Sequence, residues 1–248
     1  MANNQKSNSG NSNPIRGKFL EIIYNSPFER NINLILRYSP IVKKLKKISM
    51  KAKKPLNVLE IGSGSIGVTR FYNGEVIGID ITPEKYKNPR LRFIKGSATN
   101  LPFADSSFDV VISVDTLEHL TRKEQVKMVL EAYRVAKKLI MLTYPVGFNK
   151  YHKRILKNWK KSHLTASLEE HLHGGTATGN EVTNALKGKM CKIVKEYGAH
   201  PALAYYLNYL EQYTITKVLS RTVLKIFLPI FKRIKGDVRV YYFVTKLD

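Results

Sequence analysis

Hydrophobic residues occur along the middle of the chain in short runs that are nearly continuous rather than alternating. Their length and their β-branched content are typical of strands. Parallel strands covered by helices on both faces show this pattern, because neither face of the sheet meets water. The predicted strands span residues 57–61, 76–80, 91–95, 109–114 and 138–144, with a further strand at 191–197 and a closing strand at 238–245 after the Gly236-Asp237 turn. The pattern predicts an α/β fold with a seven-stranded, mostly parallel sheet.

Apolar residues at helical spacing predict a helix over residues 28–50, in which Pro40 is expected to cause a kink or a break. The first 14 residues are rich in Asn, Ser and Gly and contain no apolar run, so we expect a disordered tail rather than a signal peptide or a membrane span. The expected organisation is a tail at 1–14, a basic helical lid at 15–55 and one domain at 56–248, with a substrate-side insertion at 145–189 and an amphipathic helical region at 201–235.

The formal net charge is +23, from 42 basic and 19 acidic residues. Residues 56–145 contain 12 basic and 10 acidic residues, so nearly all of the excess lies in the flanking segments. Such a field attracts anionic partners, namely a membrane surface, a phosphorylated substrate or RNA. The alternative is a lysine-rich surface that only interacts with water. The single Cys191 excludes an internal disulfide and is compatible with a cytoplasmic protein.

Residues 217–235 carry six Lys or Arg residues and no acid between apolar residues. This segment is too short and too charged to span a bilayer. It fits a helix that packs on the domain, and it also fits a helix that lies on an anionic membrane surface. We therefore expect no transmembrane segment and keep open a peripheral location at the membrane.

A glycine-rich turn with Gly62, Gly64 and Gly67 follows the first predicted strand, and we expect a helix after it. Glycine lets the backbone turn sharply and approach a ligand, and a helix N-terminus offers free N–H groups to an anion. With Asp80 at the end of the next strand, the same residues satisfy the dinucleotide fingerprint of nicotinamide enzymes. The glycines alone leave both cofactor classes open.

The neighbouring segments favour a different cofactor. Residues 96–103 read Gly-Ser-Ala-Thr-Asn-Leu-Pro-Phe, and residues 105–109 read Asp-Ser-Ser-Phe-Asp. With Glu60 two residues before the first glycine, the stretch from 56 to 144 resembles the class I methyltransferases that use S-adenosylmethionine, type 11 subgroup. The resemblance implies that Glu60 helps to place the methionine portion and that Asp80 binds both ribose hydroxyls. Ser97 stands where this family usually has an acid that accepts a hydrogen bond from adenine.

The fourth predicted strand ends in Val-Asp-Thr-Leu-Glu-His-Leu at 114–120, which also resembles the subgroup. Ligands of such folds lie beyond the carboxyl ends of the strands, so this segment should face the sulfonium or the acceptor. His119 is a candidate base for a hydroxyl acceptor, and a structural role for it is the alternative. The candidate cofactor residues are Glu60, Gly62, Ser63, Gly64, Asp80, Ile81, Ser97, Ala98, Val114 and Asp115.

Two missing motifs narrow the methyl acceptor. The end of the fourth strand lacks the Asn/Asp-Pro-Pro-aromatic motif of enzymes that methylate exocyclic amines, and no cysteine pair serves attack on a pyrimidine. We therefore expect an oxygen of a small molecule, glycan or lipid rather than a nucleic-acid base. An RNA methyltransferase, an NAD-dependent oxidoreductase and a non-catalytic docking module are the alternatives. Glu170, His171 and His173 lack the spacing of a metal site, so we expect no metal.

Overall fold

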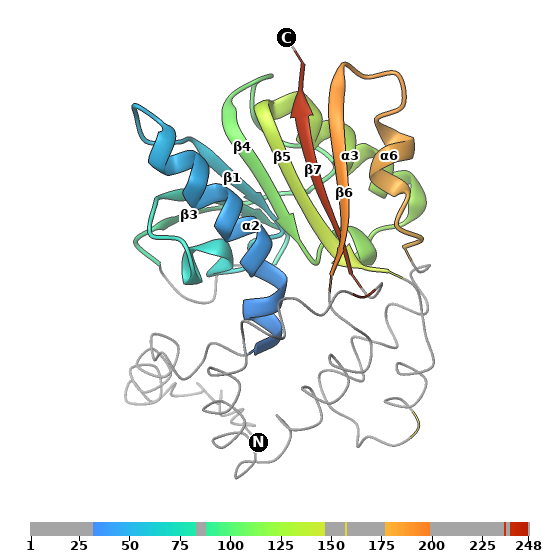
Figure 1. The fold of residues 1–248 in the computed structure, drawn as a ribbon, viewed down its shortest axis with the longest axis horizontal. Helices are drawn as coiled ribbons and strands as arrows, with labels where there is room; N and C mark the ends of the chain where they lie inside the picture. The colour runs from blue at the N-terminus through green and yellow to red at the C-terminus, as the bar shows by residue number, and fades with distance from the viewer. Residues whose placement is uncertain are drawn as a thin grey trace, which may run out of the picture.

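The computed structural model describes residues 32–82, 88–146, 157, 177–198, 236 and 239–247. Its centre is one seven-stranded sheet in the order β3-β2-β1-β4-β5-β7-β6 (Figure 1). The strands are β1 (Val58–Ile61), β2 (Val76–Asp80), β3 (Leu91–Lys95), β4 (Phe108–Val114), β5 (Ala136–Pro145), β6 (Cys191–Gly198) and β7 (Arg239–Lys246). Each lies within two residues of a predicted strand, and the central ones do so because a strand that is buried on both faces needs a nearly continuous apolar run.

Strands β1 to β5 pair in parallel, whereas β7 runs antiparallel between β5 and β6. The predicted mostly parallel, seven-stranded α/β fold is therefore confirmed. The strand order reverses at β1, whose neighbours are β2 and β4. Ligand sites of such sheets lie beyond the carboxyl ends of the strands at this reversal. The ends of β1, β2 and β4 carry most of the residues that the sequence singled out.

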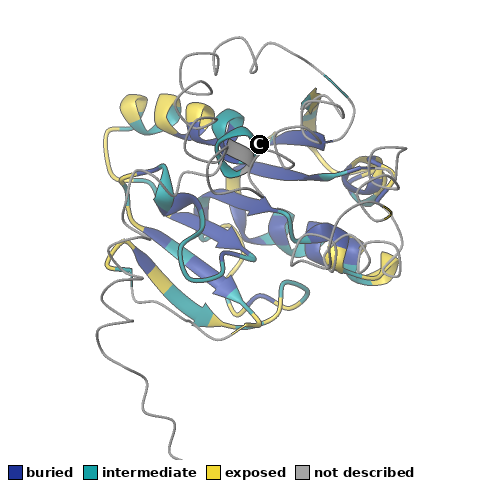
Figure 2. Ribbon diagram, turned by 90° about the horizontal axis from the view of Figure 1, so that it is seen from below, coloured by how far each residue is buried: buried dark blue, intermediate teal, exposed yellow. Residues whose placement is uncertain are grey.

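Helices cover both faces of the sheet (Figure 1). Helix α2 (Ile32–Lys51) lies on one face, and α3 (Arg122–Val135) lies with α6 (Glu181–Ala185) on the other. Alternate residues of each strand point into the two cores; Val111 packs on the α3 side, and Val110 and Ile112 pack on the α2 side. The central strands are mostly buried, the edge strands β3 and β6 are partly exposed, and the exposed residues of α2 lie on its outer side (Figure 2).

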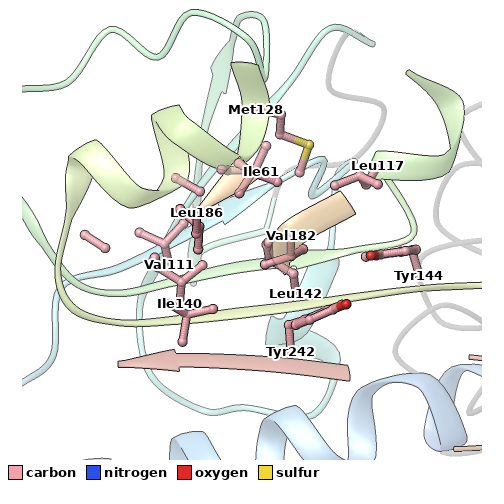
Figure 3. Close-up of a cluster of buried hydrophobic side chains, with 14 of the residues drawn as sticks. Ile61, Val111, Leu117, Met128, Ile140, Leu142, Tyr144, Val182, Leu186 and Tyr242 are labelled. Carbon is pink, nitrogen blue, oxygen red and sulfur yellow. The ribbon is translucent and has the colours of Figure 1, made fainter. Parts of the chain in front are cut away.

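The core on the α3 side joins the sheet to both of its helices. Met128 of α3 and Val182 of α6 are fully buried, and they belong to one cluster with Ile61 at the end of β1 (Figure 3). Tyr144 and Tyr242 lie at the same end of this core with their rings stacked 6.2 Å apart between centroids. This packing fixes the end of β5 against β7 and α6.

The break expected at Pro40 is absent, because α2 continues through this residue. Proline has no N–H, so the carbonyl of Leu36, one turn earlier, loses its helical hydrogen bond. The hydroxyl of Tyr241 on β7 donates to this carbonyl at 2.9 Å. A tertiary contact therefore satisfies the group that the proline leaves free. The sequence around Pro40 gives no sign of it.

The glycine turn leads into a short 3-10 segment, η2 (Gly67–Arg70), rather than into the expected α-helix. Only fourteen residues separate β1 from β2, which leaves little room for a full helix. The tail at 1–14, the first part of the predicted lid, most of the insertion, the region 201–235 and Asp237 lie outside the described residues. Within the part of the chain that the structure describes, no helix is long and apolar enough to cross a membrane.

We predict that Tyr241→Phe lowers the free energy of unfolding by about 1 kcal/mol, because it removes the bond to the Leu36 carbonyl. Adding Pro40→Ala should recover most of this loss, since the new Ala N–H can bond the same carbonyl. Urea denaturation of the natural protein, the two single variants and the double variant measures this coupling. Strictly additive effects would contradict the prediction.

Candidate functional site

The glycines of the turn after β1 differ in the space around them. Gly62, Gly64 and Gly67 all have positive φ angles. A Cβ atom at Gly67 would lie 2.0 Å from Oε2 of Glu60, whereas a Cβ at Gly64 would meet nothing within 4 Å. Gly67 is therefore required by the carboxylate beneath it, and Gly64 faces open space. Ser63 is buried and donates from its hydroxyl to the Gly64 carbonyl at 2.8 Å.

Glu60 lies beneath this turn with no exposed surface. Its Oε1 accepts from the hydroxyl of Tyr38 at 3.1 Å, and its Oε2 accepts from the backbone N–H of Val68 at 2.6 Å. Burial raises the pKa of Glu60 to about 7, although both hydrogen bonds favour the ionised form. The sequence predicted free N–H groups for an anion at the start of a helix here. The N–H of Val68 is instead bonded to Glu60.

Asp80 ends β2 beside the glycine turn. Its Oδ2 accepts from the N–H of Gly64 and its Oδ1 from the N–H of Thr82, both at 2.8 Å. These two bonds fix the plane of the carboxylate, and each oxygen keeps acceptor capacity for a hydroxyl. The following residue, Ile81, is 71% exposed, which is unusual for a large apolar side chain. The structure therefore brings Gly64, Asp80 and Ile81 together at one edge.

Ser97 and Ala98 follow β3 next to the end of β2, where the Gly96 N–H donates to the Asp80 carbonyl at 2.9 Å. The Ser97 hydroxyl is exposed and bonds the Thr99 hydroxyl at 2.9 Å. Ala98 is partly buried against the core on the α3 side. Both residues lie at the predicted edge, and their contact with adenine stays a prediction.

Arg134 of α3 holds the loop after Ser97 in place. Its guanidinium donates to the carbonyls of Leu101 and Phe103 at 3.0 and 2.7 Å, and to the carboxylate of Asp105 at 2.8 Å. Glu131, three residues earlier, accepts from the same guanidinium. Sequence reasoning did not identify Arg134, because nothing in the local pattern of α3 distinguishes it from a solvated helix residue.

Asp115 follows β4 with a φ of 55°, a conformation that costs energy for a residue other than glycine. Arg37 of α2 forms an ion pair with its carboxylate at 2.6 Å, and the buried Arg239 of β7 forms a second one. The preceding Val114 is buried. The two arginines were not predicted, because they lie 78 and 124 residues away along the chain. They tie α2 and β7 to the end of β4.

Glu118 and His119 lie in the 3-10 segment η3 (Leu117–His119) and differ in burial. His119, the candidate base, is exposed, and the next helix is capped by Thr121 with Glu124 rather than by the histidine. Glu118 is only 4% exposed, and its Oε2 has no hydrogen-bond partner among the described residues. Burial raises the pKa of Glu118 to about 8, and the negative charge of Asp115 adds to the rise.

A third buried carboxylate, after Glu60 and Glu118, lies at the end of the predicted insertion. Glu181 at the start of α6 accepts from the hydroxyl of Tyr144 at 3.1 Å and from the N–H groups of Thr178 and Gly179 at 2.6 and 2.9 Å. These bonds lower the pKa of Glu181 despite its burial. Through these bonds, Glu181 holds the residues just before α6 against Tyr144 of β5. No group of three metal-ligand residues occurs in the described segments.

The parallel sheet, the glycine turn and the acid at the end of β2 define a class I, Rossmann-like methyltransferase fold. Residues 59–139 match the family model described as Methyltransferase domain, type 11. The chain therefore carries a class I S-adenosylmethionine-dependent methyltransferase domain, as its motifs predicted. The family assignment is thus confirmed; the roles of the individual site residues stay predictions.

The chain is similar to characterised methyltransferases in sequence and in fold. It is 35% identical to norajmaline N-methyltransferase of Rauvolfia serpentina over 100 residues, and 35% identical to ajmaline N-methyltransferase of the same plant over 99 residues. These alignments cover 34% of this chain and 34% and 33% of the two relatives, so the chain spans about a third of their length. The crystal structure of the plantazolicin methyltransferase BamL has a TM-score of 0.57 at 18% identity, covering 95% of this chain and 92% of that one.

We predict that Glu118→Gln makes the protein more stable at pH 9 by about 2 kcal/mol, the order of the cost of an unpaired buried polar group. The folded-state pKa near 8 lies above the ordinary value of 4.5, so stability is full below pH 4.5 and falls as the pH rises through 8. Glutamine stays neutral, so its advantage should vanish near pH 4. Urea denaturation across this range measures the difference in stability, with the exposed Glu75→Gln as control; equal advantages at pH 4 and 9 would refute the prediction.

Proposed function

We propose that the protein transfers a methyl group from S-adenosylmethionine to a nucleophilic atom of a small-molecule acceptor. The observation that carries this proposal is the carboxylate of Asp80, held by the N–H of Gly64 at the carboxyl edge of the sheet. It lies within the segment that matches the methyltransferase family model. The BamL structure, which has the same fold, contains S-adenosylhomocysteine. The Asp80 position suits a ribose, because two carboxylate oxygens can accept two hydroxyl protons.

The remaining cofactor residues follow from this placement of the ribose. Ile81 offers an exposed apolar surface to the adenine, beside Ser97 and Ala98. Glu60 and Asp115 lie at the ends of β1 and β4, on the side where the methionine portion belongs. When bound, the cofactor supplies an electrophilic methyl group on a positively charged sulfur. The chain's part is to hold the acceptor in line with that methyl group, which alone contributes a large share of the rate.

The acceptor atom is an oxygen or a nitrogen of a small molecule. The sequence favoured oxygen because the motifs for base methylation are absent. The two relatives from Rauvolfia serpentina, in contrast, are named N-methyltransferases. A nitrogen acceptor therefore joins the oxygen as a candidate. Acceptor and cofactor meet at the end of β4, where the exposed His119 and the buried Glu118 are the titratable groups of η3. RNA methylation is the second candidate, supported by the net charge of +23.

We predict that Asp80→Ala weakens binding of S-adenosylhomocysteine at least tenfold, because two hydrogen bonds to an ionised group are lost. Titration calorimetry measures the affinity. Glu75→Ala is the matched control, since this exposed acid lies at the opposite end of the same β-strand region. With S-adenosylmethionine that carries a deuterated methyl group, the natural protein should also label a component of a cell extract, as measured by mass spectrometry. Asp80→Ala should not.

Each alternative gives a different result in the same experiment. Binding of NAD without binding of S-adenosylhomocysteine would favour the oxidoreductase. Cofactor binding without any labelled product would favour the docking module. Label recovered in RNA would replace the small-molecule acceptor. An unchanged affinity of Asp80→Ala would count against the proposed ribose site.

We also propose that the basic flanks contact an anionic membrane surface. In the described part of these flanks, α2 and the residues after it form a lysine ridge with no acid within it, and Met50 in the same stretch is 87% exposed. An apolar side chain among lysines suits a lipid interface, where headgroups attract the charges. The lysine ridge consists of Lys43, Lys44, Lys46, Lys47, Lys51, Lys53 and Lys54, all of which are exposed.

We predict that replacing Lys43, Lys46 and Lys47 by Gln weakens binding to vesicles rich in phosphatidylserine at least tenfold at low salt, since each lysine near such a surface contributes about 1 kcal/mol. Vesicle sedimentation measures it. The control replaces Arg122, Lys123 and Lys127 of α3, three exposed basic residues on the other side of the sheet. Equal losses in both triple variants, or binding to RNA but not to vesicles, would contradict a membrane surface.

A further inference from the structure

Tyr38 bonds Glu60 from a helix that precedes β1, whereas the other partner, Val68, follows β1 in η2. Tyr38 belongs to α2, is 8% exposed, and donates its hydroxyl to Oε1 of Glu60 at 3.1 Å. The ring packs in the core on the α2 side, 5.5 Å from the ring of Phe71 between centroids. Hydroxyl and ring thus have separable tasks. The ring fills space, and the hydroxyl reaches the candidate cofactor site from a helix 22 residues earlier in the chain.

Glu60 and Asp80 form an acidic pair that lacks a cation among the described residues. Neither carboxylate makes an ion pair with any residue of that part of the chain, and the charge of Asp80 acts on Glu60. Two acids without a basic partner, Glu60 fully buried and Asp80 partly exposed, make this end of the sheet negative and favour a positively charged ligand. S-adenosylmethionine carries such charge on its sulfonium and its ammonium group. Glu60 can contribute to this attraction only in its ionised form.

We propose that Tyr38 is a positioning residue of the cofactor site, whose hydroxyl keeps the Glu60 carboxylate oriented and ionised for the cationic end of the cofactor. This inference rests on the proposed function. The Tyr38 hydroxyl donates to Oε1 of Glu60, and the Val68 N–H donates to Oε2. The absence of a side chain at Gly67 leaves room for Oε2. A hydrogen bond to a charged acceptor favours the charged form, so the Tyr38 hydroxyl opposes the effect of burial.

The surrounding charges determine the expected pH dependence. Burial and, less strongly, the charge of Asp80 on β2 raise the pKa of Glu60, while the hydrogen bonds from Val68 and Tyr38 lower it, so that the pKa lies at about 7. Burial also raises the pKa of Tyr38 well above its ordinary value, with Glu60 and Asp115 adding to the rise and Arg37 opposing it. Tyr38 therefore stays a proton donor throughout the neutral range. Loss of its hydroxyl should raise the pKa of Glu60.

A second contact between α2 and the sheet lies next to the bond from Tyr38 to Glu60. Arg37, the preceding residue, forms an ion pair with Asp115 at 2.6 Å. Consecutive helix residues point about 100° apart, so one turn of α2 reaches the ends of two adjacent strands, β1 and β4. The helix that the sequence presents as a lid is thereby part of the wall of the candidate cofactor site.

The test is Tyr38→Phe, which keeps the ring and removes the hydroxyl. Calorimetry with S-adenosylmethionine and S-adenosylhomocysteine at pH 6 to 9 should show about tenfold weaker binding at pH 7 and near-natural binding at pH 9. The pH of half-maximal affinity should move upward. Tyr133→Phe is the matched control, because its hydroxyl bonds only the Met190 carbonyl among the described partners, away from the site. This control should keep the natural pH profile.

A second variant separates positioning from packing. Glu60→Gln fixes the side chain in a neutral form, so affinity should be low and independent of pH. Adding Tyr38→Phe to it should then have little further effect on affinity, since the hydroxyl acts through the charge of Glu60.

Three results would overturn the inference. They are a natural pH profile for Tyr38→Phe, an equal loss of affinity at every pH, and full additivity with Glu60→Gln. If the natural protein bound neither ligand at any pH, the proposed function itself would fail, and the inference would fail with it.

Discussion

The buried carboxylate of Glu60 is the group on which the local structure of the candidate site depends. A carboxylate with no exposed surface must have partners, because an unpaired buried charge is costly. Its two partners come from opposite directions along the chain, Tyr38 before it and Val68 after it. The first fixes α2 on the sheet, and the second shapes η2. The requirement for glycine at position 67 follows from the same oxygen.

The end of β4 is organised by charge in a similar way. Asp115 adopts a costly backbone conformation and binds two arginines from distant segments, while Glu118 close by has an oxygen without a hydrogen-bond partner among the described residues. Strain and unpaired buried atoms persist only where the surroundings enforce them, and they gather at functional sites. This edge of the sheet faces the position expected for the acceptor. The two charged clusters therefore lie near the ends of β1 and β4, where we propose that cofactor and acceptor meet.

Local patterns predicted the sheet closely. The runs at 76–80 and 91–95 coincide with β2 and β3, because both carry β-branched or aromatic residues at the positions that face the core. Gly64 and Asp80 were also found from the sequence, and the structure joins them by one hydrogen bond. The break considered at Pro40 is absent, and the helix expected after the glycines is a short 3-10 segment. At Pro40 the deciding factor was the hydrogen bond from Tyr241, and after the glycines it was the short chain between β1 and β2. Neither can be read from the helix propensity of the residues.

The sequence by itself determined the order of the strands along the chain, the glycine turn and the cofactor class, because each depends on residues close together in the chain. Only the tertiary structure decided which side chains surround the candidate site. Tyr38, Arg37 and Arg239 lie on elements that look like an ordinary basic helix and an ordinary closing strand. Their roles arise from where the sheet places their partners. A carboxylate takes its ionisation and its direction from groups that meet it in space, whatever their separation in the chain.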